Sequence, residues 1–236
     1  MIVFCSKYNV PNLPNLSVII GDCEISPTHC VKNLGSQFDQ CLSMVPHISH
    51  LCQVAFHTFR TVGCVRKYIT KDAASSLLRG LLLSRFDYCN SLLMGVPAKY
   101  IRRLQVLQNN AARIIFHAKR RDHVTPLLRE LHWLPVERRI PFKYACIVYK
   151  CLNGSGPSYL NELLTTRVST THDLRANDEL LLQIPKSRTV TYGDRSFRVA
   201  GPRTWNLLPS AIRKAKSLDS FKKALKHHHF KSYYDS

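Results

Sequence analysis

Side chains that could hold a catalytic metal are scarce in this sequence of 236 residues. A polymerase, nuclease or metal hydrolase needs clustered carboxylates to bind its divalent cations. The sequence contains no pair of adjacent aspartates, and its only adjacent acids, Asp178 and Glu179, are expected in a solvated loop. Glycine-rich phosphate loops and the HExxH and GxSxG motifs are also absent from the sequence. We therefore expect no catalytic residue, no metal and no cofactor in this chain.

Cysteine and histidine are numerous enough to raise the question of zinc, with nine and eleven copies. Cys41, His47, His50 and Cys52 lie close together, but their spacing matches no zinc module. A helix over residues 49–62 would instead place Cys52 on an apolar face. Structural thiols are therefore favoured over zinc, which remains the alternative.

Two further groups of possible ligands have unsuitable spacing. Cys146 and Cys151 lie five residues apart on one expected helix, which favours buried thiols over metal ligands. Residues 227–229 are three successive histidines, and successive helical side chains point about 100° apart, so they cannot converge on one ion.

Cysteine usage and hydropathy bear on the compartment. An odd number of cysteines without regular spacing favours reduced thiols, as in the cytoplasm or nucleus. No apolar run approaches the roughly 18 residues of a membrane span, so no membrane segment is expected. The apolar start of the chain is also too short for a signal peptide.

The formal net charge of +19 is distributed unevenly along the chain. Residues 1–59 carry two basic and three acidic side chains, whereas residues 97–150 carry twelve basic and three acidic ones. A charge this positive predicts a polyanionic partner, and nucleic acid is favoured over a membrane surface.

The expected helix over residues 99–117 has a basic and an apolar side. At about 100° per residue, Ile101, Leu104 and Ile115 share one side, and basic residues fall on the other. The alternative is a solvated basic face with no ligand. The candidate nucleic-acid contacts are Lys99, Arg102, Arg103, Arg113, Lys119, Arg120 and Arg121, with Tyr100, His117, His123 and Trp133 as aromatic rings that could stack on unpaired bases.

Hydrophobic periodicity indicates the elements that would position these residues. Short strands are expected at residues 2–4, 17–20 and 24–25. Thr70 is an expected N-cap, Pro141 should kink the helix that follows residue 135 or delay its start, and Ser217 is an expected N-cap. Helices are expected over residues 49–62, 99–117, 125–131, 135–153 and from 218, a helix or a helix pair over residues 70–93, and a β-hairpin over residues 180–185 and 189–192.

Several ordered segments resemble one protein family. Residues 84–93 (SRFDYCNSLL), 104–113 (LQVLQNNAAR) and 123–140 (HVTPLLRELHWLPVERRI) are similar to the region downstream of the palm in reverse transcriptases of jockey-like non-LTR (LINE-type) retrotransposons. Residues 32–35 (KNLG) resemble the segment directly after the palm. The similarity continues in the family's order through residues 149–154 (YKCLNG), 157–160 (PSYL), 201–209 (GPRTWNLLP) and 221–226 (FKKALK).

The residue patterns and this resemblance together predict a mainly α fold: a helical thumb-like bundle, which the resemblance implies, with a small N-terminal β element and a small α+β C-terminal module. The implied domains are residues 1–48, the end of a palm-like β element; residues 49–164, the thumb-like domain; and residues 165–236, a hairpin and helix module.

The resemblance also implies a function. The family is an RNA-directed DNA polymerase encoded by a transposable element, and its catalytic aspartates belong to a palm that would precede Met1. The expectation is a fragment that is not an enzyme on its own but holds RNA or an RNA–DNA template–primer. The alternative is a translated remnant without activity, or a fragment that binds a protein partner through an exposed apolar face.

Overall fold

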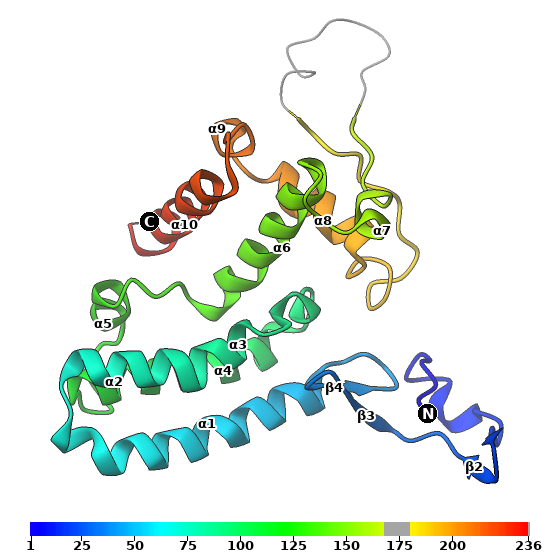
Figure 1. Ribbon diagram of the computed structural model, residues 1–236, viewed down its shortest axis with the longest axis horizontal. Helices are drawn as coiled ribbons and strands as arrows, with labels where there is room; N and C mark the ends of the chain where they lie inside the picture. The colour runs from blue at the N-terminus through cyan, green and yellow to red at the C-terminus, as the bar shows by residue number, and fades with distance from the viewer. Residues whose placement is uncertain (168–179, 236) are drawn as a thin grey trace, which may run out of the picture. The chain divides into compact units, whose positions relative to one another are not determined.

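The computed structural model describes residues 1–167 and 180–235 (Figure 1). The chain divides into two units: unit 1 comprises Met1–Leu92 and Val96–Ile115, and unit 2 comprises Leu93–Gly95 and Phe116–Ser236. Helices dominate, and the strands form small antiparallel pairs, so the predicted mainly α class with small β elements is confirmed. The division into three domains stays a prediction.

Unit 1 begins with two short β-hairpins. Strand β1 (Val18–Ile20) pairs with β2 (Cys23–Ile25), as expected, whereas residues 2–4 form no strand. Strand β3 (Cys30–Asn33) pairs with β4 (Ser36–Asp39). The turn between them has positive φ angles of 46° at Leu34 and 84° at Gly35, the backbone of a two-residue hairpin that suits the twist of its strands. A 3₁₀ turn spans Val10–Asn12.

Four α-helices and one π-helical turn of unit 1 follow the hairpins. Helix α1 (Val45–Val65) starts four residues before the predicted position and lies alongside α2 (Lys71–Leu78) (Figure 1). As predicted, Thr70 caps α2, because its Oγ1 accepts a hydrogen bond from the backbone N–H of Ala73 at 3.2 Å. The remaining segments are a π-helical turn, η3 (Arg79–Leu83), α3 (Ser84–Asp87) and α4 (Ala98–Phe116), with 3₁₀ turns at Arg66–Tyr68 and Asn90–Leu93.

The buried Arg66 ties the end of α1 to the end of α4. Its Nε donates to the carbonyl of Ile114 at 3.0 Å, and its Nη2 donates to that of Ile115 at 2.5 Å. Its Nη1 donates to the carbonyl of Ile69 at 2.8 Å. The last carbonyls of a helix have no partner within it, so the guanidinium supplies donors that α4 itself lacks.

Unit 2 is built around three long helices: α6 (Val136–Leu152), α8 (Phe197–Asn206) and α10 (Leu218–Tyr234). Helix α6 contains Pro141 without a delayed start. The Oγ of Ser217 accepts a hydrogen bond from the backbone N–H of Ser220 at 3.2 Å, so its predicted N-cap role is confirmed. The short helices are α5 (Thr125–Glu130), α7 (Ser158–Asn161) and α9 (Ser210–Arg213).

Stacked aromatic rings form the centre of unit 2. The ring centroid of Phe221 lies 4.4 Å from that of Tyr149 and 5.8 Å from that of Trp205. Phe221 is fully buried, and Trp205 is 1% exposed. The polar atoms at the edges are satisfied, because Tyr149 donates to the carbonyl of Ala215 and Trp205 to that of Leu180, at 2.9 and 2.7 Å. These contacts join α6, α8 and α10.

The predicted hairpin at residues 180–185 and 189–192 is wrong. Leu182 forms a single β-bridge with Thr166, and residues 189–192 form a turn. The side chain of Asn206 takes the place of a second strand: its Oδ1 accepts from Leu182 N–H at 2.9 Å, and its Nδ2 donates to the Leu182 carbonyl at 2.8 Å. Sequence patterns do not reveal such a distant partner.

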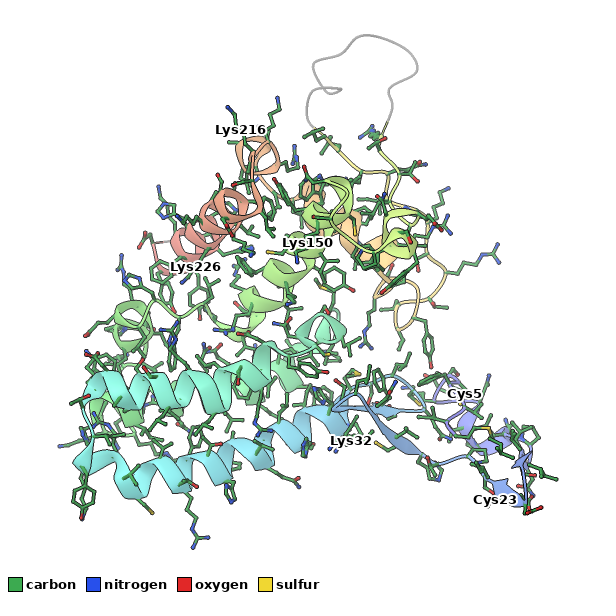
Figure 2. The ribbon with its side chains drawn as sticks, viewed as in Figure 1. Cys5, Cys23, Lys32, Lys150, Lys216 and Lys226 are labelled. Carbon is green, nitrogen blue, oxygen red and sulfur yellow. The ribbon has the colours of Figure 1, made fainter. Side chains whose placement is uncertain are left out.

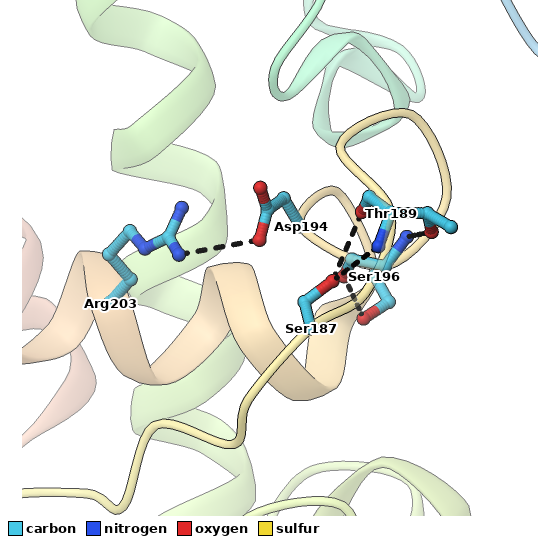
Figure 3. Close-up of polar contacts among 6 residues, drawn as sticks. Ser187, Thr189, Asp194, Ser196 and Arg203 are labelled. Carbon is cyan, nitrogen blue, oxygen red and sulfur yellow. Dashed lines mark hydrogen bonds and ion pairs between the residues drawn. The ribbon is translucent and has the colours of Figure 1, made fainter.

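The loop before α8 is closed by its own polar groups (Figure 3). Gly193 N–H donates to Thr189 Oγ1 at 2.9 Å, and Ser196 Oγ donates to the Gly193 carbonyl at 2.6 Å. A Cβ at Gly193 would lie 2.8 Å from the Thr189 carbonyl oxygen, so a larger residue does not fit. Asp194 pairs with Arg203 on α8 at 3.5 Å. Hydroxyl groups that bind nearby backbone compete with strand pairing, which explains the missing hairpin.

Within residues 1–167 and 180–235, none of the helices combines the length and apolar character that crossing a membrane requires.

We expect unit 2 to lose stability in mild acid because of His229 on α10. Burial, with help from His228 and Arg138, lowers the pKa of His229 from 6.5 to about 4. Protonation therefore favours the unfolded chain, so the contribution is fully present above about pH 6.5 and is lost progressively as the pH falls towards 4. Urea unfolding across this range should show a shallower pH dependence for His229→Phe than for the wild type. Equal pH slopes for the two proteins would contradict the assignment.

Candidate nucleic-acid interface

Helix α4 positions four of the basic candidate residues. Its apolar face is buried as predicted, with Leu104 and Ile115 fully inaccessible and Ile101 9% exposed. This burial fixes the rotation of the helix, so residues on the other side must face solvent. The helix contains no aspartate or glutamate.

Lys99, Arg102 and Arg103 form an exposed cationic face on the first half of α4. They are spaced three and four residues apart, which places them on adjacent turns of one side. None of them pairs with a carboxylate in the part of the chain that the structure describes. Arg103 Nη1 donates to Ser49 Oγ on α1 at 3.4 Å, which leaves the guanidinium at the surface. We call these three residues the α4 cationic face.

Arg113, near the end of α4, differs from these residues in its surroundings. It is only half-exposed, and its Nη1 donates to Asn110 Oδ1 at 3.4 Å. Its side chain is thus partly engaged within the helix. The structure therefore sets Arg113 apart from the α4 cationic face.

Lys119, Arg120 and Arg121 belong to unit 2 and follow the end of α4. The positive φ of 52° at His117 turns the chain out of the helix. The backbone N–H of Lys119 then donates to Asp122 Oδ2 at 2.7 Å, which closes a turn. All three basic side chains are exposed. They form a second cationic group in unit 2, whereas the α4 cationic face belongs to unit 1.

The four aromatic candidates for base stacking differ in accessibility. Trp133 is 4% exposed, so it belongs to the core of unit 2 and cannot stack on a base. Tyr100 is half-buried, with Lys99 Nζ 4.9 Å from its ring centroid. His117 and His123 are exposed. Only these two rings remain fully accessible among the predicted ones.

The cysteine and histidine candidates are not gathered into a site. No group of three or more possible metal ligands occurs in residues 1–167 and 180–235. Cys52 is buried on α1, as predicted, and burial raises the pKa of its thiol. Burial also raises the pKa of Cys146, to about 11, so this thiol stays protonated near neutral pH. Asp178 and Glu179 lie outside the described residues.

Sequence reasoning missed a pocket of unit 1 that is lined by His50, Arg85 and Tyr88. Two of these residues lie in the SRFDYCN segment, which served only as evidence of resemblance. Arg85 and Tyr88, a cation and an aromatic ring three positions apart, were the sequence feature that could have indicated this pocket.

Comparison of the chain with protein-family models, with curated proteins and with solved structures gives no match.

Proposed function

We propose that this chain is the post-palm part of a non-LTR retrotransposon reverse transcriptase and binds RNA or an RNA–DNA template–primer. The ordered similarity of its segments to that family supports the assignment. The mainly α fold agrees with the helical region that the resemblance implies. The proposed role is binding and not polymerisation, because the sequence contains no Asp-Asp pair to hold the metal ions of a polymerase.

The observation that carries the proposal is the α4 cationic face. Three exposed cations on one side of a helix, without a carboxylate on that helix, are not neutralised within the described protein. Phosphates at the spacing of a nucleic-acid backbone would supply the missing negative charge and release counterions. Lys119, Arg120 and Arg121 provide further exposed charge in unit 2. Such contacts recognise charge and duplex shape, so we expect weak sequence preference.

Reversing the charge of the α4 cationic face should abolish most of this binding. The variant combines Lys99→Glu, Arg102→Glu and Arg103→Glu. Each lost phosphate contact should lower the slope of log K against log salt by about 0.7–0.9, so the slope should fall by about 2–3. At low salt, the affinity for a labelled RNA–DNA hybrid should fall by about 100-fold or more. Fluorescence anisotropy at several salt concentrations measures both quantities.

A control with the same change in net charge is available in unit 2. It combines Lys150→Glu, Lys216→Glu and Lys226→Glu, three exposed lysines labelled in Figure 2. This variant should keep the salt slope of the wild type and lose little affinity. Equal losses in both variants would mean that binding depends on overall charge, and undetectable binding by the wild type would refute the proposal.

A protein-binding surface is the second candidate function, favoured by exposed apolar side chains in unit 1. Val18, Ile19 and Ile20 on β1 are 43%, 75% and 64% exposed, and Tyr8 is 76% exposed. A lone two-stranded hairpin with apolar side chains is typical of a strand edge that pairs with another chain. Failure to bind the hybrid, together with concentration-dependent association, would favour this candidate over the first.

A further inference from the structure

Unit 1 contains a pocket of about 440 Å³ between α1, the β3–β4 turn and the π-helical segment η3 with α3. Its volume lies in the range of pockets that hold small ligands, about 300–1,000 Å³. One side of the pocket comes from α1, where His50, Leu51 and Val54 line it. The other side comes from η3 and α3, where Leu81, Arg85 and the following Tyr88 line it.

The charge of the pocket selects an anionic ligand. No carboxylate occurs among the described residues that line it. The exposed Arg85 forms no ion pair within residues 1–167 and 180–235. Burial lowers the pKa of His47 at the back of the pocket, so this ring is neutral there. Arg85 is therefore the cation that an incoming anion would meet.

A π-helical segment with a glycine lines part of the pocket. Turns of π-helix are rare in proteins, and many of those that occur lie at functional sites. In this chain, Gly80 and Leu81 of the π-helical segment η3 line the pocket. A Cβ at Gly80 would meet no atom within 4 Å. Leu81 remains 43% exposed. Tyr88 is held in place because its hydroxyl donates to the Leu34 carbonyl at 2.6 Å.

We infer that this pocket binds one nucleotide unit, with its phosphate on Arg85 and its base between Leu81 and the Tyr88 ring. An aromatic and an aliphatic surface suit the two faces of a base, and a guanidinium suits a phosphate. This inference rests on the proposed function, which supplies the nucleic acid that the pocket would contact. It adds recognition of an unpaired nucleotide to the charge-based grip on the backbone.

Titration of the full chain with uridine monophosphate tests this inference, with the histidine ring signals followed by NMR at constant pH. The His50 signal should shift saturably. Gly80→Leu should abolish the shift by filling the pocket, and Arg85→Ala should weaken binding at least about fivefold, as expected for loss of a charge-assisted hydrogen bond. Inorganic phosphate alone should not saturate the shift.

Gly63→Leu is the matched control. Gly63 is exposed on α1, lies outside the pocket, and a Cβ there also meets no atom within 4 Å. Both substitutions replace glycine in a helix by a better helix former, so neither should unfold the protein. Equal effects of phosphate and nucleotide, or an unchanged shift in Gly80→Leu, would overturn the inference. The charge-reversal variant of the α4 cationic face should keep this shift of the His50 signal. Failure of the proposed function can therefore be distinguished from failure of the nucleotide pocket.

Discussion

Arg66→Met should lower the free energy of unfolding by about 3–5 kcal/mol, because it removes charge-assisted hydrogen bonds of about 1.5–3 kcal/mol each and leaves carbonyls without donors. The buried guanidinium donates to the carbonyls of Ile69, Ile114 and Ile115. Methionine preserves apolar volume but supplies no donor. Urea denaturation of the full chain, followed by circular dichroism, measures the loss.

Two comparison variants separate hydrogen bonding from charge. Arg66→Lys keeps the charge but lacks the planar fork that reaches several carbonyls, so it should recover only part of the loss. Arg60→Met removes an exposed arginine of the same helix and should change stability by less than about 0.5 kcal/mol. If Arg66→Met were as stable as Arg60→Met, the carbonyls at the end of α4 would need no donor from Arg66.

Phe221→Ala should destabilise the protein by about 3–5 kcal/mol, the usual cost of deleting a fully buried aromatic ring. Phe221 lies between Tyr149 and Trp205, so its removal opens a cavity where α6, α8 and α10 meet. Those rings come from separate helices and cannot all move to fill the space. Urea unfolding, with tryptophan fluorescence as the probe of Trp205, measures the effect.

Phe56→Ala is the control for this second substitution. Phe56 is 62% exposed on α1, so its truncation should cost far less. Phe221→Leu, which retains apolar volume, should lie between the two. A small effect of Phe221→Ala would mean that the aromatic stack does not hold the three helices together.

The two faces of α4 could be predicted from the sequence, because a regular helix converts residue spacing directly into direction. Leu104 and Ile115 are buried and Lys99 and Arg102 are exposed, as the periodicity indicates. The N-caps Thr70 and Ser217 could also be predicted, because the backbone N–H groups that they bind lie only three residues away. Charge and its position along the chain are likewise properties of the sequence alone.

The absence of the expected C-terminal hairpin could not be predicted, because residues typical of strands show only that a segment can form one. Leu182 satisfies its backbone through Asn206, which lies 24 residues further along the chain. Residues 187–196 bond among themselves. Strand formation depends on a partner, and no local pattern states which partner is present.

The sequence by itself determined the approximate positions of α1, α4, α5, α6 and α10, which side of α4 is basic, and that clustered carboxylates are missing. Helix α8 was not predicted. Only the tertiary structure decided that Arg66 caps α4, that Trp133 is buried, and that His50, Arg85 and Tyr88 surround one pocket. The physical reason is the range of the interactions. Helix faces and caps depend on neighbours within a turn or two, whereas burial, capping by a remote arginine and pocket formation depend on which distant segments pack together.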